Sequence, residues 1–248
     1  MRISRVYLDA VLTAHQEVRL PLETAHYLLH VLRLKVGESL IVFNGLNWDY
    51  HATLIHADKK MAMLQLHEGY FVTNESPLET VLVQALARPE HMDYSLQKAT
   101  ELGVTRIVPV ITARSPPVDN ARRDKRQGHW LRIVASACEQ CGRAYLPRLD
   151  ELQPLDAGLR SVQTDLSLVL DPSAENYLTD FNEIKVKSVA VLIGAEGGLA
   201  SEELAMATQM NYKKVRLGTR ILRTETASSA TLTLCQWLWG DWQPLKRI

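Results

Sequence analysis

The periodicity of apolar residues changes once along the chain, near Leu78, and this change constrains the fold more than any other feature. From there on, short apolar runs such as VLVQALA and VAVLIGA alternate with longer segments of helical period. This alternation is typical of a parallel sheet covered by helices on both faces, so the second part of the chain is predicted to be an α/β domain. The predicted strands are 79–87, 106–113, 166–171, 188–196 and 213–218, and the predicted helices are 91–103, 121–143, 201–210 and 224–239.

The first seventy residues are predicted to form a small β-rich domain. They contain four strand-like runs and a single stretch of helical spacing, over 23–34. The pair Asn44-Gly45 is a strong tight-turn signal, and a small closed or half-closed β-barrel is the economical arrangement. The polar, proline-containing stretch 73–77 is predicted to be a linker, which gives domains over 1–72 and 78–248. The four predicted strands are 3–8, 39–45, 50–56 and 60–66.

Composition excludes several classes of protein. Apolar residues make up 46% and charged residues 23% of the 248 positions, which excludes disordered and low-complexity chains. No run approaches the roughly 18 apolar residues of a membrane span, and the first residues lack the apolar core of a signal peptide. Three cysteines are an odd, sparse set that suits a reducing compartment, so the cytoplasm is the expected location.

Charge is distributed unevenly, although 28 basic residues balance 28 acidic ones. Segments 114–148 and 209–248 carry an excess of lysine and arginine, and the acidic segment 149–208 separates them. A basic patch can bind phosphate even when the whole chain is neutral. The alternative is a solvated helix face.

Three glycines, Gly194, Gly197 and Gly198, follow a strand and precede a helix for which Ser201 is the expected N-cap. Glycines there let a ligand approach the backbone closely, although such a segment can also be a plain tight connection. The spacing matches neither the dinucleotide fingerprint nor the phosphate-binding P-loop. Two acidic residues in the first turn of the helix would repel phosphate, so a neutral or cationic ligand is favoured.

A second unusual segment, 217–227, mixes bulky apolar and charged residues without a regular period. Arg220 and Arg223 bracket Ile221 and Leu222, an arrangement that suits a pocket wall with an apolar face and a cationic rim. A plain connection into the last helix is the alternative.

The third candidate is the end of the long basic helix. Glu139, Gln140 and Arg143 lie within one turn there, either as a functional group or as an i,i+4 ion pair between Glu139 and Arg143. Cys138 and Cys141 form a C-x-x-C pair, but a zinc site needs about four ligands and there is no second pair. Redox cysteines belong at the start of a helix. The sequence contains neither H-E-x-x-H nor G-x-S-x-G, so metal catalysis and serine hydrolysis are disfavoured and no metal is expected.

Four segments, QKATELGVTRIVPVITARS, SACEQCGR, LIGAEGG and LGTRILRTETA, occur in this order after the β-rich domain and closely resemble the RsmE family. Members of that family are SPOUT-class methyltransferases, which use S-adenosylmethionine to methylate N3 of a uridine in small-subunit (16S) ribosomal RNA. The resemblance implies a trefoil-knotted α/β domain preceded by a PUA-like RNA-binding β-barrel. It also implies a homodimer, with the cofactor in the knot near the subunit interface.

The resemblance further implies a set of cofactor-binding residues. Two segments depart from the family: Ala195 stands where it usually has proline, and 88–91 lacks the lysine it tends to have there. The implied cofactor-binding residues are Leu170, Gly194, Glu196, Gly197, Gly198, Leu217, Gly218, Ile221, Leu222 and Arg223.

Methylation at N3 requires removal of a proton and stabilisation of the charge left on the base. The predicted base is Glu139, and the predicted stabiliser is Arg143 or Arg223. Two alternatives remain: ribose 2′-O-methylation with the same cofactor pocket, and a non-catalytic RNA-binding protein of the same fold. The residues predicted to bind the RNA, free or in an assembled small subunit, are Arg2, Arg5, Arg33, Arg122, Arg123, Lys125 and Arg126.

Overall fold

The computed structural model describes residues 3–58 and 61–243. The chain forms two compact units, one made of Met1–Glu75 with Ala135–Leu146, and the other of Ser76–Val134 with Pro147–Ile248. The domain limits drawn from the sequence, 1–72 and 78–248, stay predictions. No helix in the described residues is long and apolar enough to cross a membrane.

The first unit is built on a five-stranded sheet with the order β1-β3-β4-β5-β2. Strands β3, β4 and β5 pair antiparallel, β2 pairs antiparallel with β5, and β1 pairs parallel with β3. Alternate side chains in one stretch of each of the two long strands are fully buried, because successive residues of a strand point to opposite faces; they are Ala52 and Leu54 of β4 and Ala62, Leu64 and Leu66 of β5. The strands are β1 (Arg5–Tyr7), β2 (Glu17–Arg19), β3 (Ser39–Phe43), β4 (Trp48–Ala57) and β5 (Ala62–Phe71).

The predicted helix over 23–34 is shorter and irregular. It is an α-helix, α1 (Leu22–His26), which continues as one π-helical turn, Tyr27–Val31. Leu28 from this turn is fully buried in the core of the unit, among residues of the sheet such as Leu40, Leu54 and Leu64.

The second unit contains a parallel sheet with the order β12-β10-β11-β6-β7-β8, and β9 also pairs with β7. The four central strands are apolar and buried on both faces, as a covered parallel sheet requires. The strands are β6 (Glu79–Ala85), β7 (Arg106–Ile111), β8 (Arg148–Leu149), β9 (Gln153–Pro154), β10 (Leu166–Leu170), β11 (Ser188–Ile193) and β12 (Lys213–Val215).

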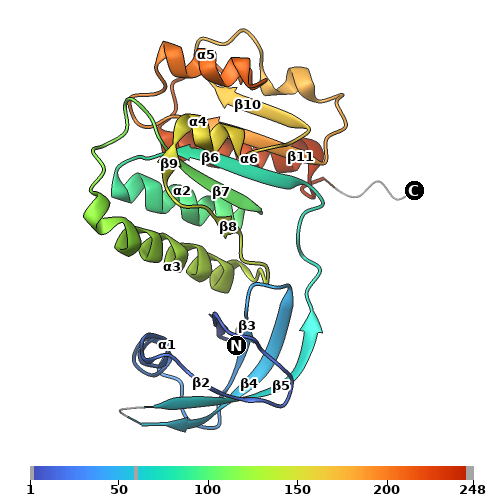
Figure 1. The fold of residues 1–248 in the computed structure, drawn as a ribbon. Coiled ribbons are helices and arrows are strands. Elements are labelled where there is room, and N and C mark those ends of the chain that lie inside the picture. The colour runs from blue at the N-terminus through green and yellow to red at the C-terminus, as the bar shows by residue number, and fades with distance from the viewer. Residues whose placement is uncertain (1–2, 59–60, 244–248) are drawn as a thin grey trace. The chain divides into compact units, whose positions relative to one another are not determined.

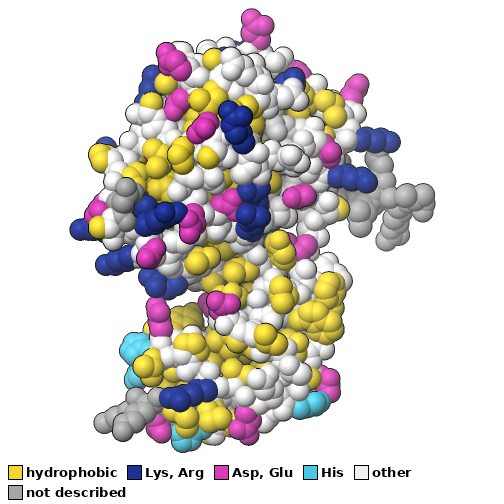
Figure 2. Space-filling model, in the orientation of Figure 1, with side chains coloured by type: hydrophobic (Ala, Val, Ile, Leu, Met, Phe, Trp, Pro, Cys, Tyr) yellow, Lys and Arg dark blue, Asp and Glu magenta, His cyan; other side chains and the backbone are white. Residues whose placement is uncertain are grey.

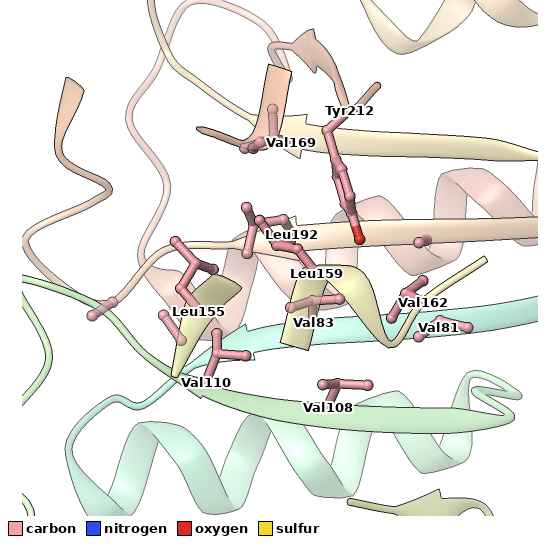
Figure 3. Close-up of a cluster of buried hydrophobic side chains, with 14 residues drawn as sticks. Val81, Val83, Val108, Val110, Leu155, Leu159, Val162, Val169, Leu192 and Tyr212 are labelled. Atoms are coloured by element: carbon pink, nitrogen blue, oxygen red, sulfur yellow. The ribbon is translucent and has the colours of Figure 1, made fainter. Parts of the chain in front are cut away.

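Helices cover both faces of this sheet (Figure 1). On one face, Leu155 and Leu159 of α4 pack against valines of β6 and β7, with Ala207 of α5 in the same cluster (Figure 3). On the other face, α6 packs against β6, β11 and α2. The helices of this unit are α2 (Pro89–Glu101), α4 (Leu155–Arg160), α5 (Ser201–Gln209) and α6 (Thr224–Trp239), and the long helix α3 (Arg123–Cys141) runs from this unit into the first.

The observed helices and strands agree with the predicted ones in part. The predicted closing helix, 224–239, matches α6. The predicted N-cap of α5 was wrong by one residue: Ser201 is the first helical residue, and Glu203 accepts a hydrogen bond from the backbone N–H of Ala200 at 2.8 Å. Strand β2, the two-residue strands β8 and β9, and helix α4 were not predicted.

Candidate active site

A cavity of about 410 Å³ opens where three neighbouring parallel strands end. Leu170 ends β10, Ile193 ends β11 and Val215 ends β12, and all three line the cavity. Crevices at the carboxyl ends of parallel strands are the usual ligand sites of open α/β sheets, and this volume lies in the range of small-molecule sites.

The predicted cofactor-binding residues gather at this cavity with a single exception. Those from Leu170 to Leu222 all line it, whereas Arg223 is exposed and is the N-cap residue of α6. Ile221, at the rim, is 84% exposed. The cavity therefore brings together the glycine segment, 194–198, and the first part of the segment 217–227, which the sequence marked separately.

The glycine segment is a tight turn whose backbone leaves no room for side chains. The N–H of Gly198 donates to the carbonyl of Ala195 at 2.9 Å, and Gly198 has a φ of +74°, which favours glycine. A β-carbon at Gly194 would lie 2.9 Å from the carbonyl carbon of Gly198. Glycine at Gly194 is thus required by the close approach of the two ends of the turn, and glycine at Gly198 is favoured by its backbone conformation.

Gly197 faces Arg114 rather than open space. A β-carbon at Gly197 would lie 3.1 Å from Cδ of Arg114, and the Arg114 guanidinium donates to the Gly197 carbonyl at 2.5 Å. Arg114 also lines the cavity. Arg114 was not predicted from the sequence, because 83 positions separate it from its partner in the chain.

Polar contacts anchor the turn to the sheet. The Thr224 hydroxyl donates to the Gly194 carbonyl at 2.6 Å, and it accepts a hydrogen bond from the Gln84 amide at 3.1 Å. Gln84 is buried in β6 and also donates to the Ala85 carbonyl. The start of the turn is thereby fixed to both α6 and the central sheet.

The cavity is lined by charges of both signs. Burial alone would raise the pKa of Glu196, but hydrogen bonds from the backbone N–H of Arg88 and from His91 hold it below its ordinary value. In the same way, hydrogen bonds from Ser173 outweigh burial at Asp171 and lower its pKa. Three arginines also line the cavity: Arg114, Arg216 and Arg220. A ligand with both cationic and anionic groups suits these walls better than a simple anion.

Comparison with known proteins gives the same picture for both parts of the chain. Residues 74–236 match the model of an RNA methyltransferase domain, and residues 20–62 match that of an RNA methyltransferase PUA domain. Ribosomal RNA small subunit methyltransferase E of Buchnera aphidicola, from Schizaphis graminum, is 32% identical over 97% of this chain and 98% of its own. The chain belongs to the ribosomal RNA small subunit methyltransferase E family. The Bacillus subtilis member is 27% identical over 83% of this chain and 84% of its own.

Two solved structures resemble the whole chain. One is ribosomal RNA small subunit methyltransferase E of Neisseria gonorrhoeae bound to S-adenosylmethionine, 34% identical with a TM-score of 0.89 over 98% of this chain and 100% of that one. The other is a methyltransferase of Legionella pneumophila with the same bound cofactor, 35% identical with a TM-score of 0.92 over 97% and 100%. The predicted membership of the RsmE family is confirmed, and so is the predicted fold: a SPOUT trefoil-knotted α/β domain preceded by a PUA-like β domain.

The predicted base of this RsmE family member, Glu139, lies in the first compact unit. Its carboxylate accepts a hydrogen bond from the backbone N–H of Tyr7 at 3.0 Å. Burial raises the pKa of Glu139, and it outweighs the opposing effects of this hydrogen bond and of Arg5. Arg143 is buried and donates to both carboxylate oxygens of Glu75, at 2.9 and 2.6 Å.

The residues predicted to bind RNA differ in how accessible they are. Arg2 lies outside the described residues. The guanidinium of Arg5 is bidentate on Asp49 and also donates to the Arg143 carbonyl, and its side chain is only 11% exposed, which favours a structural role. Arg33 is exposed, with a φ of +57°.

The basic stretch at the start of α3 is largely exposed, and Figure 2 shows dark-blue side chains gathered on this side of the molecule. Arg122 pairs with Asp119 at 3.2 Å, and Arg123 pairs with Glu151. The guanidinium of Arg126 lies 5.7 Å from the ring centre of Trp130, and Lys125 is exposed.

The C-x-x-C cysteines are free thiols. Cys138 is buried, and burial raises its pKa to about 12, which makes it a poor nucleophile at neutral pH. Within 3–58 and 61–243, no three His, Cys, Asp or Glu side chains gather in a way that could hold a metal ion.

Proposed function

We propose that this protein methylates N3 of a uridine in small-subunit ribosomal RNA, with S-adenosylmethionine as the methyl donor. The observation that carries the proposal is the cavity at the ends of β10, β11 and β12, whose walls combine a glycine turn, apolar side chains and charges of both signs. Membership of the RsmE family supplies the class of reaction.

The donor set of the cavity fits S-adenosylmethionine. Apolar side chains such as Leu170 and Leu222 suit the flat adenine, while backbone groups of the turn suit its polar edge. The carboxylates of Asp171 and Glu196 suit the hydroxyl and ammonium groups of the cofactor, and an arginine such as Arg216 suits its carboxylate. When bound, the cofactor supplies a methyl group on a positively charged sulfur.

Glu139 is proposed to take the N3 proton. A carboxylate with a raised pKa is a better base near neutral pH than an ordinary one, and burial raises the pKa of Glu139. The hydrogen bond from Tyr7 holds one carboxylate oxygen and fixes the direction of the other. Loss of the N3 proton leaves on N3 the electron pair that would form the new N–C bond, while the methyl–sulfur bond of the bound cofactor would break and its electron pair would stay on a neutral thioether.

Arg223 is proposed to stabilise the charge left on the uracil oxygens. The alternative, Arg143, already donates to both oxygens of Glu75. Arg223, in contrast, is exposed at the start of α6, and no side-chain cap hydrogen bond is formed at this position. An exposed guanidinium is accessible to a substrate oxygen, whereas Arg143 would first have to leave its pair with Glu75.

RNA binding is proposed to use the exposed cations Arg33, Arg122 and Lys125, together with their neighbours Arg123 and Arg126. Phosphate contacts by such residues supply affinity without base specificity. The target uridine must be unpaired or flipped out, because N3 lies on the Watson–Crick edge. We also propose that the working form is a homodimer, which light scattering would test.

The test is methylation of purified small ribosomal subunits that lack the modification, beside the same RNA free of protein. After digestion, mass spectrometry of the nucleosides separates 3-methyluridine from a ribose-methylated nucleoside. The proposal expects 3-methyluridine, formed only with S-adenosylmethionine. A ribose-methylated product would favour 2′-O-methylation, and RNA binding without cofactor binding by calorimetry would favour a non-catalytic RNA-binding protein.

A further inference from the structure

His91 lies between the glycine turn and the first turn of α6. Its Nδ1 lies 2.8 Å from Oε1 of Glu196, in the glycine turn, and its Nε2 lies 4.0 Å from Oε1 of Glu225, in the first turn of α6. The three side chains are 22%, 31% and 14% exposed, so they are partly shielded from water. One imidazole thus lies within 4.0 Å of a carboxylate from the glycine turn and of a carboxylate from the first turn of α6, where the neighbouring Thr224 lines the cavity.

The hydrogen bond at Nδ1 defines what this end of the ring does. The lowered pKa of Glu196 keeps it a carboxylate at neutral pH, so it accepts and Nδ1 of His91 donates. The same carboxylate oxygen accepts the backbone N–H of Arg88, where α2 begins. Glu196 is therefore held from α2, although it belongs to a loop more than a hundred residues away.

The other end of the ring faces a carboxylate that needs a partner. Oε2 of Glu225 is buried and has no hydrogen-bond partner in the described part of the chain. A buried carboxylate oxygen without a partner is costly. Nε2 of His91 lies 4.0 Å from the other oxygen, Oε1, which is within ion-pair distance but longer than a hydrogen bond. Without this ring, no side chain would lie between the carboxylates of Glu196 and Glu225 to link the two elements.

We propose that His91 is a positioning residue that holds the glycine turn and the start of α6 at the separation the cofactor requires. The inference rests on the proposed cofactor site.

The experiment compares three variants at 25 °C with S-adenosylmethionine as the calorimetric titrant. His91→Ala removes both contacts. His91→Asn keeps a donor near the position of Nδ1 but no group near Glu225. The matched control is His129→Ala, because His129 forms the same kind of pair, 2.8 Å from Asp93 of the same helix α2, away from the cavity lining. For His91→Ala we expect a dissociation constant about tenfold higher, as for the loss of a hydrogen bond to a charged group. We expect an intermediate dissociation constant for His91→Asn and one within twofold of wild type for His129→Ala.

Amide hydrogen exchange without cofactor is the second measurement. His91→Ala should accelerate exchange in 194–199 and 223–227, and His91→Asn should restore protection in the first segment only. A merely structural His91 would lower the melting temperature without this local pattern or the partial rescue by asparagine. Unchanged exchange in both segments would overturn the inference. If the wild-type protein binds no S-adenosylmethionine, the proposed function fails, while the exchange data still decide whether His91 couples the two loops.

Discussion

The glycine turn offers the sharpest test of the cofactor site, through the substitution Gly194→Ala. The added β-carbon would lie 2.9 Å from the carbonyl carbon of Gly198, 3.1 Å from its α-carbon and 3.2 Å from Cγ of Leu199. Normal contacts between carbon atoms are about 3.5–4.0 Å. Two of these three neighbours are backbone atoms, so no flexible side chain can move aside to relieve the clash.

The turn has little freedom to adjust. Gly198 is fixed by its hydrogen bond to Ala195, and the carbonyl of Gly194 is held by Thr224. Overpacking of this kind costs about 1–3 kcal/mol, which corresponds to a factor of roughly 5–150 in an equilibrium constant. Because the strained segment lines the cavity, we expect the cost in cofactor affinity, with the β-strands of the sheet unaffected.

Isothermal titration with S-adenosylmethionine and with S-adenosylhomocysteine measures the loss of affinity. Calorimetric melting measures any part of the strain that lowers the stability of the fold instead. The matched control is Gly128→Ala in α3, where an added β-carbon meets no atom within 4 Å. Helix propensity there predicts a gain of about 0.5–1 kcal/mol in stability and no change in cofactor affinity. Affinity within twofold of wild type in Gly194→Ala would refute the reasoning, since the turn would then have absorbed the β-carbon without changing the site.

Three further predictions follow from the electrostatics. Glu139→Gln keeps an acceptor for the N–H of Tyr7, so it should preserve the fold and the cofactor affinity. It should lower turnover about 100-fold or more, with partial recovery at high pH. An unchanged rate in single-turnover assays would return Glu139 to a structural role. The hydrogen-bonded carboxylate of Glu196 has a lowered pKa, so its stabilisation is present above its ordinary pKa of 4.5 and is lost as the pH falls through the lowered value. Glu196→Gln should therefore flatten the acid limb of a melting profile, and an identical limb would contradict this assignment. Replacing Arg122 and Lys125 by alanine should weaken RNA binding uniformly across sequences and reduce the slope of log K against log salt by about 2; anisotropy titrations that show an unchanged slope would remove both from the phosphate contacts.

The fold followed from sequence where an element is long enough to show its period. The apolar strands β6, β10 and β11 and the helix α6 have such patterns, and each was predicted at nearly its observed place. Strand β2 has three residues and β8 and β9 have two, too few to distinguish a period of two from chance. The π-helical turn of Tyr27–Val31 was not predicted for another reason. Its backbone hydrogen bonds join residues five apart rather than four, but the apolar pattern of the sequence is still that of an ordinary α-helix.

The candidate site was predicted in part for a similar reason. Glycine at Gly194 and Gly198 is a local signal, because the backbone conformation and the close approach are properties of the turn itself. The contacts that hold the turn are not local: Arg114, Thr224 and His91 reach it from other elements. None of these three residues has a local sequence signal, because only the fold brings it to the turn.

The position of the cavity follows from the order of the strands. The chain leaves β10 for β11 on one side and later returns to β12 on the other side of β10. After β11 it enters α5, which packs with α4 on one face, and after β12 it enters α6, which packs on β6 and β11 together with α2. The two connections therefore diverge around the end of β10, and their divergence leaves the crevice that Leu170 lines.

A ligand in that crevice must touch both connections at once, so substitutions in the glycine turn and in the 217–223 segment should be non-additive in their effect on cofactor affinity. A double-mutant cycle between Gly194→Ala and Leu222→Ala measures this coupling, and simple additivity would show that the two loops bind independently.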